Sequence, residues 1–503
     1  MKLKTLSTAI LLTTVPMTGV FAAAMDRSGQ SISAFLQPGN YFEAGISVLD
    51  PTVEGQEAGT SATQRNISDM AGDYYFPSAA LKLQPTDKFS FGILYDQPFG
   101  ADAEYTGNNV FVSNGGETVL PQATLNSISQ NAVTQLVTAA GAAFAPALVA
   151  VTNVTGGNPL APTQQEVLGA LQQVAAGGNA TVAGGLTQLQ QTQAALNATN
   201  SALGQGNTKV EVNTQNLAFV FGFQPTENWN IYAGPVYQTV KGNLSLRGQA
   251  YSLFNGYDAS IKETGDLGWL AGLAFQIPEI ALKASLTYRS EIEHEADTTE
   301  SLSALSPALI GILQGVGVSA DKLAALDESG KNKITTPQSV NLDFQTGIME
   351  NTVAFANVRW VEWSKFAIRP HQFGKIAEAV GSLPSVNRPN GFNLVEYSDD
   401  QISATVGVGR KLSEQWAGNV SVGWDSGAGN PVSTLGPTEG YWNVGLGVQF
   451  SPAPNYFIAG GVKYFMLGDA KAQTGAQAGG DEYVAKFEDN DALAYGLKIG
   501  YRF

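Results

Sequence analysis

Histidine chemistry is the first possibility to test in this sequence, because a histidine beside a serine or cysteine can form a nucleophilic catalytic site. The 503 residues include only two histidines, His294 and His371, and no cysteine. His294 follows two glutamates near the end of a predicted strand, and His371 lies in a predicted loop at residues 369–372. We therefore expect both to be surface or rim residues and predict no catalytic residue.

Metal and phosphate sites are also poorly supported. Asp399 and Asp400 form an acidic pair, but the other ligands of a calcium loop do not stand at the required spacing. Gly407 and Gly409 belong to an alternating strand pattern and not to a strand-to-helix phosphate loop. Without cysteine the chain cannot form a disulfide scaffold or a cysteine-bound zinc or iron-sulfur centre. We expect no metal, no cofactor and no enzymatic activity.

Charged residues are scarce and mostly acidic. Only 14% of residues are charged, against roughly 25% in an ordinary soluble domain, and 27 Lys+Arg stand against 43 Asp+Glu. A net charge of −16 argues against nucleic acid as a partner, because binding to phosphates needs a basic surface. The low charge also argues against a charge-rich disordered chain.

The N-terminus has the three parts of a secretory signal peptide: two lysines, a short apolar run, and small residues up to Ala24. We predict that residues 1–24 are removed, with cleavage after Ala22 or Ala24. A short membrane anchor is the alternative, but the apolar run is far below the roughly 20 residues that a spanning helix needs. The best later candidate, residues 139–151, is also too short and contains a proline.

Alternation with a period of two dominates the rest of the chain. At the C-terminus every second residue from Leu493 to Phe503 is large and apolar, and the residues between them are small or cationic. A soluble sandwich also alternates, but its outer face is usually rich in Lys, Glu and Thr. Here the polar face is mainly Gly, Ser, Asn and Thr, the apolar rows begin or end in aromatic residues, and short turns alternate with long excursions. These features indicate a transmembrane antiparallel β-barrel of a Gram-negative outer membrane.

We count about fourteen strands, each near or above the roughly 9–11 residues that cross a tilted bilayer. An even number places both ends of the wall on the same side. The span 229–246 is among the weakest, because Pro235 removes a ladder donor. The predicted spans are 40–53, 74–84, 88–105, 208–224, 229–246, 266–277, 281–299, 334–349, 352–366, 399–412, 415–426, 440–450, 456–468 and 490–503.

The first long excursion, residues 106–207, contains only two charged residues, Glu117 and Glu166. Thr163 and Glu166 form a capping box that opens a helix. A second helix is predicted from apolar residues that recur every seven positions, and an earlier one is possible at about 127–144. These helices either cap each other outside the barrel or take part in ligand capture. The heptad residues are Val182, Leu189, Leu196 and Leu203.

The second excursion, residues 301–333, also has helix signals. Ser306 followed by a proline marks one helix start, and Ser319 marks another, from Asp321 to Leu326. Four side chains are too apolar for a solvated loop, so they must bury against the other insertion, the barrel mouth or a hydrophobic solute. They are Leu309, Ile310, Leu313 and Val316.

Several segments in order resemble the FadL family of outer-membrane long-chain fatty acid transporters. They are residues 286–292 (LTYRSEI), 358–366 (VRWVEWSKF) and 422–426 (VGWDS), together with the strands at 91–105 and 494–503. The resemblance covers nearly all of the mature chain apart from residues 106–207. It implies a fourteen-strand barrel with an N-terminal luminal plug called a hatch. It also implies a hydrophobic external groove and a kinked third strand that opens a lateral exit.

On this sequence the hatch would be residues 25–39, ahead of the barrel at 40–503, and the kink would lie at residues 97–100. The hatch is shorter than is usual in the family and lacks the family's Asn-Pro-Ala element. The long helical insertion follows the third strand instead of the fifth, and the loop at 247–265 is short. Ligand identity and gating are therefore not carried over from the family.

The resemblance implies a passive transporter of long-chain fatty acids or similar hydrophobic compounds, with outer-membrane lipid and detergent as its other contacts, and we expect a monomer. Leu309, Ile310, Leu313 and Val316, with Leu189 and Leu196 as further candidates, would line the groove, and Phe99 the exit. A carboxylate would pair with Arg289, Arg359 or Lys463. Gating would involve Pro98 and Gly100 at the kink with Asp26, Arg27 and Ser28 of the hatch. The alternatives are a channel for aromatic or alkane hydrocarbons, a general porin, and a structural or adhesive barrel.

Overall fold

The computed structural model describes residues 25–114, 122–201, 205–303, 305, 310–311, 313–314, 317–328, 330–383 and 386–503. The predicted signal peptide at residues 1–24 lies outside these ranges. So do Leu203, the predicted helix start at Ser306, Leu309 and Val316.

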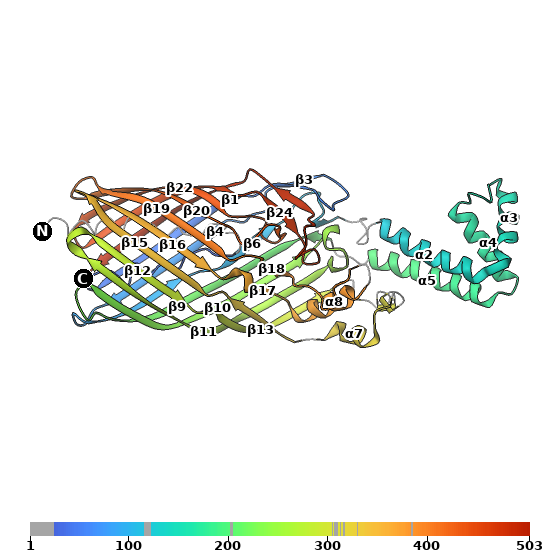
Figure 1. The fold of residues 1–503 in the computed structure, drawn as a ribbon, viewed down its shortest axis with the longest axis horizontal. Coiled ribbons are helices and arrows are strands. Elements are labelled where there is room, and N and C mark those ends of the chain that lie inside the picture. The colour runs from blue at the N-terminus through green and yellow to red at the C-terminus, as the bar shows by residue number, and fades with distance from the viewer. Residues whose placement is uncertain are drawn as a thin grey trace.

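Fourteen strands form a closed antiparallel barrel, as predicted (Figure 1). Three of them, the third, seventh and eighth, are each built from two consecutive segments. The first strand pairs with the second on one side and with the last on the other, which closes the wall. In order the strands are β1 (Tyr41–Thr52), β4 (Tyr74–Leu83), β5 (Phe89–Asp96) with β6 (Gly100–Glu104), β9 (Lys209–Phe223), β10 (Trp229–Leu246), β11 (Tyr257–Ile277), β12 (Leu282–Arg289) with β13 (Ile292–Leu302), β14 (Lys331–Thr336) with β15 (Ser339–Met349), β16 (Thr352–Val361), β19 (Gln401–Lys411), β20 (Trp416–Asp425), β22 (Tyr441–Ala453), β23 (Tyr456–Leu467) and β26 (Asp491–Arg502).

The strand bounds differ from the predicted spans in a few places. β11 begins at Tyr257, well before the predicted residue 266, so the loop ahead of it is shorter still. Pro235 lies inside β10 as predicted, opposite Trp269 of β11. The ladder with β9 skips residues 234 and 235, because proline has no N–H to donate.

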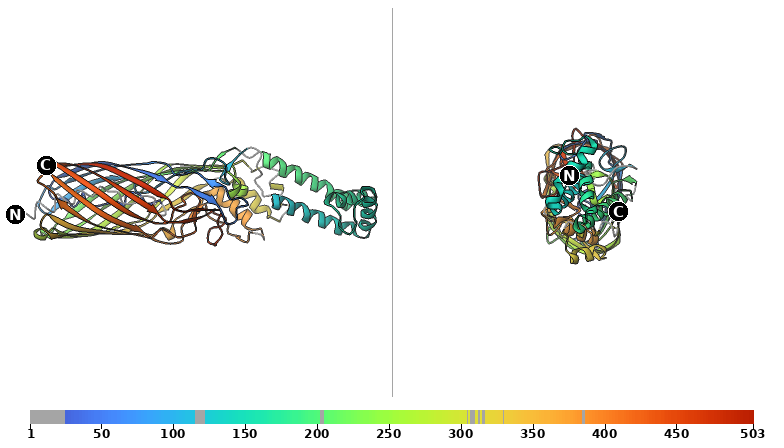
Figure 2. Two further views of the ribbon diagram at one scale, coloured as in Figure 1. Left: turned by 90° about the horizontal axis from the view of Figure 1, so that it is seen from above. Right: turned by 90° about the vertical axis from the view of Figure 1, so that its right-hand side faces the viewer.

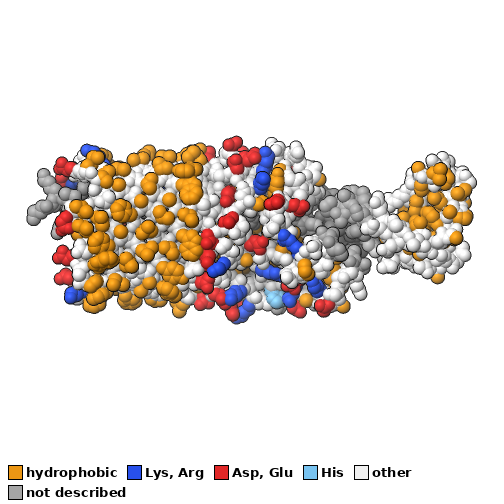
Figure 3. Space-filling model, viewed as in Figure 1, with side chains coloured by type: hydrophobic (Ala, Val, Ile, Leu, Met, Phe, Trp, Pro, Cys, Tyr) orange, Lys and Arg blue, Asp and Glu red, His pale blue; other side chains and the backbone are white. Residues whose placement is uncertain are grey.

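The outer face of the barrel carries an apolar band bounded by charged residues at both ends (Figure 3). Lipid-facing side chains around the barrel are exposed in the isolated chain, for example Ile46 of β1, Phe221 of β9 and Leu446 of β22. Aromatic pairs occupy the edge of this band nearest the short turns, including Trp416 with Phe450 at 4.7 Å between ring centroids. Such girdles mark the two water interfaces of a membrane barrel.

The C-terminus lies at the end with the short turns, and the long loops gather at the other end (Figures 1 and 2). Two features of this loop end were not predicted. One is a small sheet of β2 (Gly55–Glu57), β3 (Asn66–Ile67), β21 (Val432–Ser433), β24 (Ala470–Gln473) and β25 (Ala485–Phe487). The other is helix α8 (His371–Gly381), whose first residue is His371, so the predicted loop there is wrong.

His294 corrects a second expectation. It is completely buried on the luminal face of β13, with Nε2 at 3.0 Å from Oε1 of Gln238, and is not a surface residue. The strand alternation places it inward, although the flanking glutamates point outward.

The first insertion forms a helical stalk that extends away from the barrel along its axis (Figure 2). It consists of α2 (Gln122–Ala140), α3 (Phe144–Thr155), α4 (Gln164–Ala176) and α5 (Ala180–Ser201), and the capping box of Thr163 and Glu166 is confirmed. The helix expected at 127–144 is divided at Gly141, which has φ +54°. By length and composition the stretch Ser129–Thr155 could cross a membrane, contrary to our expectation, and 17% of its most apolar 18-residue window is buried.

The stalk has a core of its own. Val133, Leu136, Leu171, Val182 and Leu189 pack together between its helices. Leu189 therefore does not line a groove at the barrel mouth, and the side chain of Leu196 is not among those described. At the base of the stalk β7 (Val112–Ser113) pairs with β8 (Gly206–Asn207).

The second excursion is shorter than predicted, because β13 continues to Leu302 and β14 already begins at Lys331. Ser319 occupies the N-cap position of α7 (Ala320–Ala324), as expected, although its hydroxyl makes no capping hydrogen bond. Leu313 is buried in the core of the loop end, and Ile310 packs against the same core. These two residues form packing contacts and do not line an open groove.

Candidate functional site

Residues 25–39, which we call the hatch segment, lie inside the barrel. Phe35 is completely buried and contacts the ring of Tyr232 edge-on at 5.8 Å. Two luminal glycines make room for it: a Cβ on Gly92 would stand 2.5 Å from the Phe35 ring, and one on Gly222 would stand 2.8 Å away. The hatch segment therefore fills the part of the lumen nearest the short turns.

Buried polar contacts hold this segment to the wall. Arg359 donates from Nε to Oδ2 of Asp26 at 2.6 Å, and both side chains are only 3% exposed. Arg289 donates from Nη2 to the carbonyl oxygen of Gln30 at 2.9 Å. Ser28 donates to the carboxylate of Asp96 on β5. Arg289 and Arg359, expected to pair with a ligand carboxylate, instead bind the hatch segment.

The third strand is interrupted at residues 97–99, where the resemblance places the kink. The start of the hatch segment pairs with this interruption: the N–H of Arg27 donates to the Pro98 oxygen at 2.7 Å, and the N–H of Gly100 donates to the Met25 oxygen at 2.9 Å. Phe99 is buried against Trp363, with ring centroids 5.4 Å apart. Phe99 therefore points into the protein and not toward lipid.

The wall beside the interruption lacks part of its ladder. β4 pairs with β1 along residues 74–82, but with β5 only from Ala79 to Leu83. Within the described ranges, residues 74–78 form no ladder with β5 or β6. Nearer the loop end the two sides meet again through a bridge between Ala71 and Ala103.

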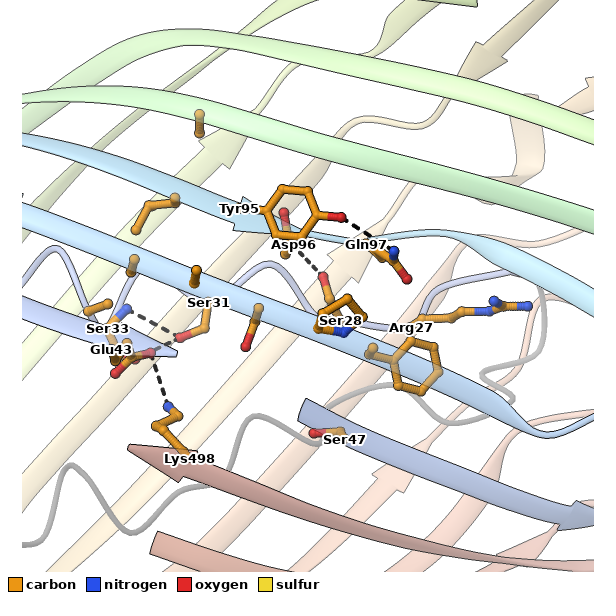
Figure 4. A pocket seen from close by; sticks show the side chains of 18 of the residues that line it. Arg27, Ser28, Ser31, Ser33, Glu43, Ser47, Tyr95, Asp96, Gln97 and Lys498 are labelled. Carbon is orange, nitrogen blue, oxygen red and sulfur yellow. Dashed lines mark hydrogen bonds and ion pairs between the residues drawn. The ribbon is translucent and has the colours of Figure 1, made fainter. Parts of the chain in front are cut away.

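A narrow cavity, which we call the wall cavity, occupies this place, with about 70 Å³ open to the centre of a water-sized sphere (Figure 4). Its luminal lining includes Ser47, Ser78 and Asp96. It is also lined by residues of the lipid-facing rows, namely Val48, Pro77 and Tyr95. The wall cavity thus extends from the lumen toward the outer face at the gap in the ladder.

A second narrow cavity, which we call the apolar chamber, lies nearer the loop end, with about 50 Å³ open to the centre of a water-sized sphere. Arg27 lines both cavities. Its guanidinium carbon lies 3.8 Å from the ring centroid of Tyr74, and its Nη2 makes no hydrogen bond to any described residue. The apolar lining is Met25, Leu49, Met70, Val210, Val212, Ile368, Val395 and Leu435.

Sequence reasoning missed these lining residues. Leu49, Val210 and Val212 lie on the luminal side of their strands, where polar residues are the rule in a membrane barrel. Apolar residues at luminal positions near the loop ends of the strands were the sequence signal that could have predicted this cavity. Lys463, also predicted to contact ligand, lines neither cavity.

Metal ligands do not cluster in the described part of the chain: no group of three His, Asp or Glu side chains is arranged to hold an ion. The site therefore consists of two cavities, one cation between them, and a hatch segment fixed by buried polar contacts. This arrangement suits the passage of an apolar solute.

The sequence profile of the outer membrane protein transport protein family (OMPP1/FadL/TodX) matches residues 127–503. The chain belongs to this family. The FadL/TodX family consists of outer-membrane transporters of hydrophobic compounds in Gram-negative bacteria, so the resemblance found in the sequence and the predicted location are confirmed.

Solved structures of FadL/TodX proteins share the fold. A FadL homologue from Pseudomonas aeruginosa is 12% identical with a TM-score of 0.58, covering 99% of this chain and 98% of that one. The toluene transporter TodX from Pseudomonas putida is 10% identical with a TM-score of 0.51, covering 97% and 98%. No curated protein matches this chain in sequence.

Proposed function

We propose that this FadL/TodX protein is a passive channel that carries hydrophobic compounds into the outer membrane. The solute enters the apolar chamber from the loop end, passes Arg27, and leaves through the wall cavity beside Pro98. The observation that carries this proposal is the position of Arg27, between a chamber with apolar walls and a cavity that reaches the lipid-facing rows.

The physical chemistry supports a sideways exit. Burial of apolar surface contributes about 25 cal/mol per Å² removed from water, so an apolar solute is stabilised both in the chamber and in lipid. Continuing down the lumen would bring it to the hatch segment and the polar groups around Arg359. The gap beside β4 leads from the chamber side to lipid without crossing water. Such transfer needs no energy source.

Uncharged hydrocarbons are the substrates that the site favours. Arg289 and Arg359 are already bound to the hatch segment, so the cation that lines the chamber is Arg27, whose Nη2 makes no hydrogen bond to a described residue. TodX is a toluene transporter, which agrees with an uncharged aromatic or alkyl substrate. Long-chain fatty acids are the second candidate, with the carboxylate on Arg27. The buried hatch segment disfavours a general porin.

Uptake of labelled toluene and labelled oleate tests the route. We compare wild-type protein with Pro98→Val/Gly100→Val, which alters the interruption of the third strand. A Cβ at Gly100 would stand within 2.7 Å of the Val212 oxygen and closer still to the Arg27 guanidinium. We expect uptake to fall to that of cells without the protein.

Pro235→Val is the matched control, because Pro235 is a lipid-facing proline in the uninterrupted strand β10. Heat-modifiable gel migration shows that each variant has formed its barrel. Wild-type uptake by the kink variant would refute lateral release. Arg27→Met separates the substrates: oleate uptake falls if the carboxylate binds Arg27, whereas toluene uptake does not.

A further inference from the structure

A groove lies on the outer face of the barrel, across β19, β20, β22 and β23, near the end with the short turns. It contains about 960 Å³ of empty space, counted to its open side. Its walls are formed by apolar residues and glycines, with Arg410 and Asn419 as the polar residues of the lining. The lining includes Arg410, Leu412, Gly418, Val448, Gly460 and Val462.

Two lipid-facing glycines form the floor of this groove. Gly418 pairs with Val448, and Val448 pairs with Gly460, so the two glycines lie on either side of Val448 in one row across the strands. A Cβ on Gly418 would come no closer than 3.4 Å to any neighbour, and one on Gly460 no closer than 3.6 Å. Neither position therefore requires glycine for space. Glycine in a strand interior costs about 0.5–1 kcal/mol relative to alanine, so the missing side chains are unfavourable for the wall alone.

Arg410 lies at one side of the groove, in register with Gly418. The other residues on its face of β19 are apolar, including Val406, Val408 and, just beyond the strand, Leu412. The aromatic girdle at the short-turn end passes through Trp416, two residues from Gly418, so Arg410 lies about 7 Å from the girdle as measured along the strands, toward the membrane interior. A cation on the lipid face is unfavourable unless its long side chain reaches the interface and meets an anion there.

We propose that this groove binds one phospholipid of the periplasmic leaflet. An acyl chain lies over Gly418 and Gly460, and the phosphate accepts hydrogen bonds from Arg410. The planar guanidinium suits a phosphate, because it donates two parallel hydrogen bonds. The periplasmic leaflet follows from the short turns, which mark the periplasmic end of such barrels. This site is separate from the transport route and does not depend on it.

Native mass spectrometry of the full-length protein, purified in detergent with added palmitoyl-oleoyl phosphatidylglycerol, tests the proposal. We expect the wild type to retain one phospholipid. Arg410→Gln should lower the occupancy roughly tenfold or more, because charge-assisted hydrogen bonds to the phosphate are lost. Gly418→Leu/Gly460→Leu fills the groove with side chains that point into lipid, and it should lower occupancy equally.

Lys411→Gln is the matched control. Lys411 is the next residue along β19, on the opposite face, and it pairs with Glu414 at 3.0 Å. It should retain the lipid, and all variants should keep heat-modifiable migration. The proposal is overturned if the Arg410 or the double glycine variant retains as much lipid as the wild type. It is also overturned if dioleoylglycerol, which lacks the phosphate, is retained as well as the phospholipid.

Discussion

The ion pair between Asp26 and Arg359 should decide how firmly the hatch segment is held. Asp26→Asn would leave Arg359 buried without its counter-charge. Removing one partner of a buried pair costs about 3–5 kcal/mol. Arg359 still contacts Asn341 at 2.6 Å and Gln30 at 3.1 Å, so we take about 3 kcal/mol, the lower end of that range. This corresponds to roughly a hundredfold rise in the population with the hatch segment released.

Cysteine labelling can measure that population, because the natural chain contains no cysteine. Ala34 is 5% exposed in the hatch segment, so a maleimide reaches Ala34→Cys only after local opening. When opening is fast relative to labelling, the labelling rate follows the open population. We expect Asp26→Asn to accelerate labelling roughly a hundredfold.

Glu43→Gln is the control, because Glu43 pairs with Lys498 at 3.1 Å between two wall strands and not with the hatch segment. It should leave the labelling rate of Ala34→Cys unchanged. Asp26→Asn/Arg359→Met removes both charges and should label more slowly than Asp26→Asn alone, since no unpaired buried charge remains. An unchanged rate in Asp26→Asn would show that the pair does not anchor the hatch segment.

Three further predictions concern other parts of the molecule. Replacing residues 114–205 by a short Gly-Ser linker should leave heat-modifiable migration unchanged, because the stalk has its own core; loss of the barrel would contradict this. Gly92→Ala should push on Phe35 and raise the Ala34→Cys labelling rate, since overpacking costs about 1–3 kcal/mol; an unchanged rate would mean that Phe35 relaxes freely. Burial raises the pKa of Glu439, in the loop before β22, from 4.5 to about 7. The loop should therefore lose stability as the pH rises from about 4.5 to 7, because the carboxyl ionises more readily in the unfolded loop. Limited proteolysis of the loop should be faster at pH 8 than at pH 5, and Glu439→Gln should abolish this difference.

The barrel was predictable because lipid imposes a local rule. Every second residue on a strand must be apolar, so the pattern from Leu493 to Phe503 identifies a strand without knowledge of its partner. The capping box at Thr163 and Glu166 is local in the same way. Helix α8 should have been visible too, since Phe373, Ile376 and Val380 recur at helical spacing.

The site was less predictable, because its contacts join residues far apart in the chain. The sequence correctly predicted that Arg359 lies in the lumen. No local sequence pattern shows that it forms an ion pair with Asp26, which is 333 positions away. The strands of the loop-end sheet are two to four residues long, too short to show a period, and β21 pairs in parallel with β24 across a long loop. Leu313 was expected to meet a solute, but the core of the loop end buries it, and only the assembled loops show this.

The pairing of β1 with β26 has a consequence for biogenesis. The register joins Tyr41 to Arg502, so the wall cannot close until the last residues of the chain have been exported. Before that moment β1 and β23 are both free edges, and free edges pair readily with other chains. Folding must therefore follow translocation of the whole polypeptide, and a nonsense mutation that removes only β26 should leave an open, aggregation-prone sheet in place of a slightly smaller channel.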